Sequence, residues 1–156
     1  MKPRYRIVVV GGGITGLMAA ALLARNEHAD QLDITVLDAA PRPLVSLEDD
    51  VALRVSAIST GSAQLFAEVG AWEQVIESRA SAYERMCVWD ESDAPDSDAA
   101  LHFDAAEFAV PQLGFIVENV LLQEALLRQL GTLSVDLRFG SPLRALQNTG
   151  THYQLR

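Results

Sequence analysis

Short apolar runs and turn residues at the start of the chain follow the order strand, helix, strand. Ile7–Val10 is a run of β-branched residues that leads directly into three glycines, which is typical of a buried parallel strand before a tight turn. From Ile14 to Asn26 the chain is rich in Leu, Ala and Met and predicts a helix that is buried on most of its surface. A second strand is predicted at Ile34–Leu37 and ends at Asp38. Together these segments predict one βαβ unit over residues 5–38.

The chain after this unit begins with a loop and continues into a helix. Residues 39–51 contain two prolines and three acidic residues, which predict a long loop of the kind that often carries function. A helix is predicted at Ala63–Val69, with Ser62 as its N-terminal cap and Gly70 as its end. Trp72 is expected to pack just beyond this helix.

An acidic loop separates two predicted strands in the middle of the chain. The strands are Met86–Trp89 and Leu101–Phe103, and we expect them to pair. The loop between them, residues 90–98, holds five acids and no Lys or Arg, which is typical of a solvated loop and not of a metal site. Further on, leucines recur every four positions within residues 118–130, which predicts an amphipathic helix.

The last part of the chain predicts three short strands, at residues 135–139, 143–147 and 152–155. Residues 148–150 join the last two strands as a hairpin-like turn. The whole pattern predicts an α/β fold with a parallel sheet and additional antiparallel strands. Because the sequence stops at Arg156 inside a predicted strand, we expect a fragment whose uncovered strand edges favour self-association.

Composition excludes several classes of function. The 156 residues carry 12 Lys and Arg against 21 Asp and Glu, a net charge of -9, so we expect no nucleic-acid partner. Cys87 is the single cysteine, which rules out an intramolecular disulfide and favours a buried, inert thiol in a reducing, cytoplasmic compartment. No apolar stretch reaches the roughly 18 residues of a membrane-spanning helix. The three histidines lack ligand spacing, so no metal site is expected.

The strongest chemical signal is a glycine motif with an acid placed after it. Gly11, Gly13 and Gly16 fit the spacing G-x-G-x-x-G between the first predicted strand and the helix. Asp38 ends the next strand 22 residues after Gly16, which is the arrangement of a dinucleotide-binding site. Gly11 permits the sharp turn, Gly13 lets the backbone approach a pyrophosphate, and Gly16 lets the helix lie close to the strand.

The start of the predicted helix supplies groups that bind phosphate. Backbone N–H groups around Ile14 and Thr15 are expected to point at a pyrophosphate, and the helix dipole favours its negative charge. Asp38 is expected to accept hydrogen bonds from a ribose diol of the adenosine half. The chain is therefore predicted to bind an ADP-containing dinucleotide. FAD and NAD share the motif and both remain open, whereas the acid disfavours the 2′-phosphate of NADP.

Further segments carry a family resemblance. The chain reads DVALRVSAIST at residues 50–60 and FDAAEFAVPQLGFIVENVLLQEAL at residues 103–126, with GAW and VWD between them in that order. Taken with GGGITG, these segments resemble the FAD-dependent aromatic-ring hydroxylases of ubiquinone biosynthesis. They are closest to the type that hydroxylates the demethoxy benzoquinol intermediate. The resemblance extends over residues 6–146.

The resemblance implies a function that the residue pattern alone does not. It implies FAD as cofactor, with NAD(P)H and O2 as co-substrates, in the hydroxylation of a polyprenylated benzoquinol or phenol. In this family, reduced flavin takes up O2 as a C4a-hydroperoxide that transfers a hydroxyl group to the ring, so no catalytic side chain is expected. It also implies association with other ubiquinone-biosynthesis proteins and a peripheral position at the inner membrane.

The resemblance also assigns residues to the cofactor site. The family's fingerprint for the ADP part of FAD matches Gly11, Gly13, Gly16 and Asp38. Arg54 matches the arginine that reaches toward the flavin and its pyrophosphate, and Gln123 stands where the family places an arginine or glutamine near the cofactor. On the residue pattern alone, Arg54 is an ion-pairing surface arginine and Gln123 a solvated helix residue.

Family members are longer than this chain, which leaves two alternatives open. They carry a second flavin motif of D-G type and a third of G-D type, and both are absent from residues 1–156, as is most of the substrate-binding region. We therefore expect the N-terminal part of an FAD-binding domain. One alternative is a truncated module that binds FAD or ADP without catalysis. The other, an NAD-dependent Rossmann dehydrogenase, is disfavoured by the long loop before Arg54.

Overall fold

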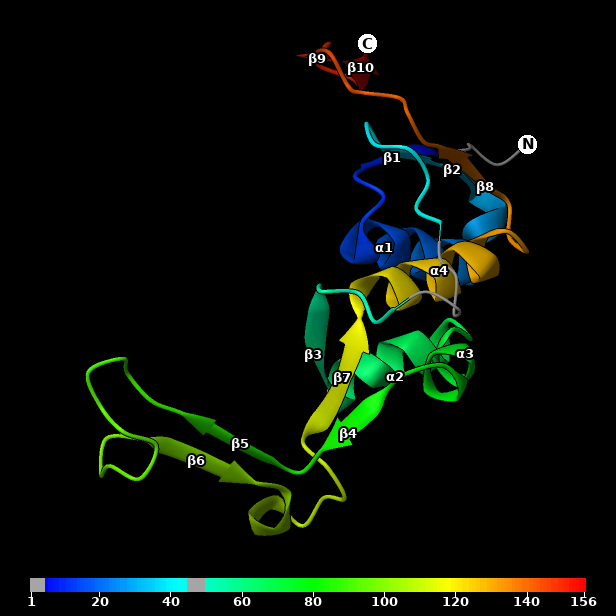
Figure 1. Cartoon of the computed structure of the whole chain (residues 1–156). Coiled ribbons are helices and arrows are strands. Elements are labelled where there is room, and N and C mark those ends of the chain that lie inside the picture. Colours follow the sequence, from blue (N-terminus) through cyan, green and yellow to red (C-terminus); the bar gives the residue numbers. More distant parts are fainter. Residues whose placement is uncertain (1–4, 45–49) are drawn as a thin grey trace.

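The computed structural model describes residues 5–44 and 50–156. A three-stranded parallel sheet lies on one side of a pair of helices (Figure 1). Its strands are β1 (Tyr5–Val10), β2 (Leu32–Leu37) and β8 (Val135–Arg138), in the order β1-β2-β8. Helix α1 (Ile14–Arg25) and the 3-10 turn η1 (Ala29–Gln31) join β1 to β2. The predicted βαβ unit over residues 5–38 is confirmed.

Helix α1 packs against α4 (Asn119–Leu130), and this pair forms the centre of the core. The leucines at every fourth position of α4 are completely buried, namely Leu122, Leu126 and Leu130. On α1, Leu17, Ala20 and Ala21 are also completely buried. The small alanine side chains let the two helices approach closely while the leucines fill the space between them. The predicted amphipathic helix is therefore confirmed, although it begins at Asn119 because Glu118 belongs to a strand.

A second, antiparallel sheet lies on the other side of α4 (Figure 1). Its strands are β3 (Val55–Ser59), β7 (Gly114–Glu118) and β4 (Ser81–Tyr83), in the order β3-β7-β4. None of these strands was predicted. Each is three to five residues long, and the pairing of β3 with β7 joins residues about 60 positions apart, so no local pattern signals it. An added Cβ at Gly114 would collide with the Ile58 carbonyl oxygen, which explains the glycine there.

Two short helices cover this second sheet. They are α2 (Thr60–Glu68) and α3 (Trp72–Glu77), of which only α2 was predicted. The predicted cap of α2 is wrong: Ser59 Oγ accepts a hydrogen bond from the Ser62 N–H, so the helix begins three residues earlier than predicted. Trp72 packs edge-on against Phe115 of β7 with ring centroids 4.9 Å apart, which confirms that it packs beyond α2.

A hairpin projects from the second sheet (Figure 1). It pairs β5 (Arg85–Val88) with β6 (Leu101–Asp104), as predicted, and η2 (Ala105–Phe108) follows it. In the loop between the strands, the backbone and hydroxyl of Ser92 donate hydrogen bonds to Asp90 and lower the pKa of that carboxyl. Within residues 5–44 and 50–156, no cluster of His, Cys, Asp and Glu is arranged to hold a metal ion.

The predicted burial of Cys87 is wrong. The thiol lies half-exposed on the hairpin, 3.6 Å from the Pro95 carbonyl oxygen and 3.9 Å from His102 Nε2. A two-stranded hairpin that projects from the body has no second layer to cover it, so its side chains stay partly in contact with water.

The chain ends in a second hairpin of β9 (Leu146–Asn148) and β10 (Tyr153–Leu155). The predicted turn between them is confirmed, but β9 begins three residues later than predicted, after a segment that crosses the face of the parallel sheet.

Within the described residues, every helix falls short of the length and hydrophobicity that a membrane-spanning helix needs.

Candidate dinucleotide-binding site

The glycine loop follows β1 at the carboxyl end of the parallel sheet. Gly11 has a φ of +114°, a conformation that a side chain rarely adopts, and its N–H donates a hydrogen bond to the Leu37 carbonyl oxygen at 2.7 Å. An added Cβ at Gly16 would collide with the Gly11 carbonyl oxygen and lie 3.3 Å from a Val9 methyl group. The sharp turn at Gly11 and the close helix-to-strand approach at Gly16 are therefore present, as the motif predicted.

The start of α1 is open to a ligand. Gly13 is the N-cap residue, and a Cβ placed there would meet no atom within 4 Å. No side chain caps the helix and no acid lies in its first turn. The first backbone N–H groups, at Ile14 and Thr15, thus have neither a capping side chain nor an acidic residue of the first turn beside them. These features fit a pyrophosphate at the start of the helix.

Asp38 contacts the glycine loop directly. Its Oδ2 accepts a hydrogen bond from the Gly12 N–H at 2.5 Å, and its Oδ1 accepts one from the Ala40 N–H at 2.7 Å. The carboxylate is therefore fixed between the ends of the neighbouring strands β1 and β2. Each carboxylate oxygen can accept two hydrogen bonds, so Asp38 keeps capacity for a ribose hydroxyl while it holds the loop.

Gln123 reaches the same loop from α4. Its Nε2 donates a hydrogen bond to the Gly12 carbonyl oxygen at 3.1 Å, and the side chain is half-buried. At the other end of the helix, Gln129 Oε1 accepts a hydrogen bond from Arg25 at 3.1 Å. Helices α4 and α1 therefore run in the same direction, and both N-termini lie at the glycine loop. The residue pattern alone predicts that Gln123 is a solvated helix residue, and this prediction is wrong.

Arg54 lies beside the start of α4. Its carbonyl oxygen accepts a hydrogen bond from the Asn119 N–H at 3.0 Å, which places its backbone one helical turn from Gln123. The side chain is exposed, and no described residue forms an ion pair or hydrogen bond with its guanidinium. The structure thus brings the Arg54 segment and Gln123 to one end of α4, while the expectation of a surface ion pair is not met among the described residues.

Two residues of this region were not singled out from the sequence. Glu118 and Asn119 end β7 and begin α4, and both contact the segment that carries Arg54. They belong to the run at residues 103–126 that carries the family resemblance, so the resemblance contained the signal. The residue pattern did not, because an acid before a leucine-rich helix is an ordinary helix start.

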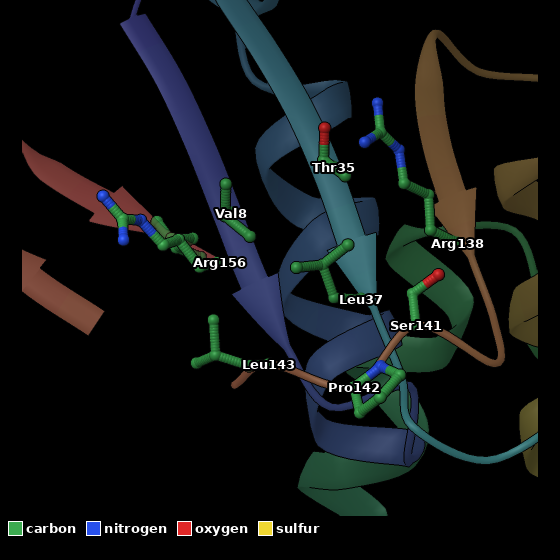
Figure 2. Close-up of a pocket in the computed structure, with 9 residues that line it drawn as sticks. Val8, Thr35, Leu37, Arg138, Ser141, Pro142, Leu143 and Arg156 are labelled. Carbon is green, nitrogen blue, oxygen red and sulfur yellow. The ribbon is translucent and has the colours of Figure 1, made fainter. Parts of the chain in front are cut away.

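A cavity of about 330 Å³ lies on the other face of the parallel sheet (Figure 2). Val8, Thr35 and Leu37 form its floor, and these side chains alternate with those that face α1. Arg138 and Ser141 lie at its edge. The Arg138 guanidinium is paired with Asp136 at 2.6 Å, and the residues that line the cavity do not include those of the glycine loop, 11–16.

Comparison with known proteins agrees with this geometry. Residues 9–55 match the model of the NAD(P)-binding Rossmann-like domain. The mitochondrial ubiquinone biosynthesis monooxygenase of Xenopus tropicalis is 38% identical over 143 residues, or 91% of this chain and 30% of that protein. The 3-demethoxyubiquinol 3-hydroxylase of Escherichia coli (strain K12) is 38% identical over 142 residues, or 90% of this chain and 34% of that protein. The resemblance to the hydroxylases of ubiquinone biosynthesis is confirmed.

The human relative of these hydroxylases is 37% identical over 83% of this chain and 27% of its own length. This chain therefore spans about a third or less of the length of the relatives it matches. Among solved structures, p-nitrophenol 4-monooxygenase PnpA from Pseudomonas putida DLL-E4 has a TM-score of 0.70 at 17% identity, over 99% of this chain and 36% of that chain. CtdE in complex with FAD has a TM-score of 0.61 at 16% identity, over 97% of this chain and 34% of that chain. These likenesses confirm the predicted α/β fold.

Proposed function

We propose that this chain binds the ADP part of FAD in a monooxygenase that hydroxylates a polyprenylated benzoquinol or phenol in ubiquinone biosynthesis, with NAD(P)H and O2 as co-substrates. The observation that carries the proposal is the convergence of α1, Asp38 and Gln123 on the loop around Gly12. The activities for which the relatives are named support the reaction and its substrate class.

Different residues of the site would bind different parts of the cofactor. The N–H groups of Ile14 and Thr15, with Gly13 leaving space above them, would bind the pyrophosphate. Asp38 would accept hydrogen bonds from the ribose of the adenosine half. Gln123 holds the Gly12 carbonyl oxygen and so fixes the loop that faces the phosphates.

Arg54 is the cation of the proposed site. The chain carries an excess of nine negative charges, and phosphate binding needs a local positive charge against this background. An exposed guanidinium beside the start of α4, without a carboxylate partner among the described residues, meets this need. The bound flavin would supply the redox and oxygen-transfer chemistry, and the chain's own residues bind and orient it.

Location follows from the substrate class. A polyprenyl chain partitions into lipid, so an enzyme that acts on it meets its substrate at a membrane surface. We therefore extend the proposal to a cytoplasmic protein that associates peripherally with the inner membrane and with other proteins of the pathway. Flotation with liposomes that contain a ubiquinone analogue tests this extension, because a protein that stays at the bottom of the gradient contradicts it.

The visible absorption spectrum of the purified protein, with mass spectrometry of any released ligand, tests the cofactor assignment. We expect flavin bands and a released mass of FAD, and NAD(P)H oxidation stimulated by a quinol analogue. A protein that binds FAD but shows no NAD(P)H oxidation would favour the alternative of a binding module without catalysis. A colourless protein that takes up no FAD but binds NADH would favour a Rossmann dehydrogenase and overturn the proposal.

A further inference from the structure

Three hydrogen bonds hold alternate residues of the segment around Arg54. Glu118 Oε2 accepts from the Ala52 N–H at 2.7 Å, and the Asn119 N–H donates to the Arg54 carbonyl oxygen at 3.0 Å. Ser56 Oγ donates to Asn119 Oδ1 at 2.6 Å. Two adjacent residues at the β7–α4 junction therefore hold the segment before, at and after Arg54, through the backbone at Ala52 and Arg54 and through the side chain at Ser56.

Glu118 is buried and paired with a cation. Its side chain is 3% exposed, and Arg79 Nε lies 2.9 Å from its Oε1 without the alignment of a hydrogen bond. Arg79 Nη2 donates to the Oε2 atom at 3.3 Å. A buried carboxylate is costly unless charge and hydrogen bonds compensate it, and Glu118 has both. The carboxylate therefore makes two contacts at this junction: it pairs with Arg79 and it accepts a hydrogen bond from the Ala52 N–H.

Asn119 connects the two parts of the proposed site. It is the first residue of α4, and Gln123 follows one turn later on the same face of the helix. Asn119 contacts the Arg54 segment while Gln123 contacts Gly12. The start of α4 is therefore a rigid link between the glycine loop and the arginine.

We propose that Glu118 and Asn119 are positioning residues that hold the Arg54 guanidinium on the phosphate side of the site by fixing residues 52–56. This inference rests on the proposed function, because it assigns Arg54 to the bound cofactor. The two residues do not touch the cofactor, and their effect on its affinity passes through Arg54.

A double-mutant cycle on FAD affinity tests this inference. Asn119→Ala removes the hydrogen bond from Ser56, and we expect the dissociation constant of FAD to rise about fivefold, as for the loss of one hydrogen bond. Ser56→Ala removes the other end of the same bond and should have the same effect. In an Arg54→Ala background, Asn119→Ala should change the constant less than about twofold, because the residue that it positions is gone.

Gln129→Ala is the matched control. It removes two side-chain hydrogen bonds at the far end of α4, one donated to the Gly70 carbonyl oxygen and one accepted from Arg25, and should leave FAD affinity unchanged. An effect of Asn119→Ala that is equally large with and without Arg54 would overturn the inference, as would no effect in either background. A wild-type protein that binds no FAD overturns the proposed function as well, whereas additive effects in a protein that does bind FAD overturn this inference alone.

Hydrogen exchange of the Ala52 amide gives a readout that does not need the cofactor. In the wild-type protein this amide should exchange slowly, because it is bonded to a buried carboxylate. Glu118→Ala should speed its exchange at least about tenfold, and Glu118→Gln, which keeps an acceptor, should preserve most of the protection. Fast exchange in the wild-type protein, or equal protection in the Ala and Gln variants, would contradict the assigned contact.

Discussion

Gln123 donates a hydrogen bond to the carbonyl oxygen of Gly12, which lies 111 positions earlier in the sequence. This contact joins the glycine loop after β1 to the first half of α4. Because Asn119 of the same helix binds the backbone at Arg54, one helix links every part of the proposed site outside the βαβ unit. The relative positions of the site residues therefore depend on how α4 packs on α1.

The contact itself can be tested with an isosteric change. Gln123→Glu keeps the shape of the side chain but replaces the N–H donor with a carboxylate oxygen, which repels the Gly12 carbonyl oxygen and a nearby phosphate. We expect FAD to bind about tenfold more weakly to Gln123→Glu and a few-fold more weakly to Gln123→Ala. Fluorescence titration measures both. Equal FAD affinities in the two variants would mean that a negative charge at position 123 does not affect binding of the cofactor.

The close approach at Gly16 predicts a loss of stability. Gly16→Ala forces a Cβ into the Gly11 carbonyl oxygen, so α1 must move away from β1, at a cost of about 1–3 kcal/mol in the free energy of unfolding. Gly61→Ala on α2 is the control, since a Cβ there meets nothing within 4 Å and alanine favours a helix. Urea denaturation of the two variants should separate them clearly. A Gly16→Ala protein as stable as wild type would show that the loop tolerates a side chain there.

Substitution of Asp38 should lower both the stability of the glycine loop and the affinity for FAD. An asparagine has one acceptor oxygen in place of two, so Asp38→Asn must lose the hydrogen bond donated by the Gly12 N–H or the one donated by the Ala40 N–H. We expect a loss of about 1 kcal/mol in stability and FAD affinity about tenfold lower. Asp136→Asn, an exposed strand acid that pairs with Arg138, is the control and should change the affinity little. If both variants lower the affinity equally, the effect is general electrostatics and not a specific contact.

The open edge of the parallel sheet predicts self-association of this chain. β1 is one of the two edge strands of the three described strands, and Tyr5 and Val10 on it are 61% and 55% exposed. Unpaired backbone groups beside exposed apolar side chains favour pairing with another chain. We expect sedimentation velocity to show concentration-dependent association that Tyr5→Lys reduces. A protein that stays monomeric across the accessible concentration range would refute this prediction.

The sequence predicted the βαβ unit because its signals are local. Ile7–Val10 is a uniform apolar run, Ile34–Leu37 is apolar except for Thr35, and the glycines stand directly between strand and helix. In contrast, β3 and β7 are short and their pairing depends on Val55 meeting Glu118, which lies 63 positions later in the chain. The pattern predicts Glu118 in the following helix because an acid at a helix start is ordinary, and its burial depends on Arg79 from a different part of the chain.

The same distinction holds for the site. The roles of Gly11, Gly16 and Asp38 follow from spacing, because a turn and two neighbouring strand ends bring them together. Arg54 and Gln123 were found only through the family resemblance, since nothing in their immediate surroundings indicates that α4 returns to the glycine loop. Pattern reasoning cannot supply a contact such as that of Gln123 with Gly12, because it arises from the tertiary packing of two helices.

Competition between nucleotides tests the central claim most directly. If the glycine loop binds the ADP half of the cofactor, FAD should bind to the purified protein, ADP should displace it, and FMN, which lacks the adenosine half, should bind far more weakly. Equilibrium titration followed by flavin fluorescence measures all three. FMN binding as tight as that of FAD, or FAD binding that ADP does not affect, would contradict the assignment of Gly11, Gly13, Gly16 and Asp38 to the ADP site.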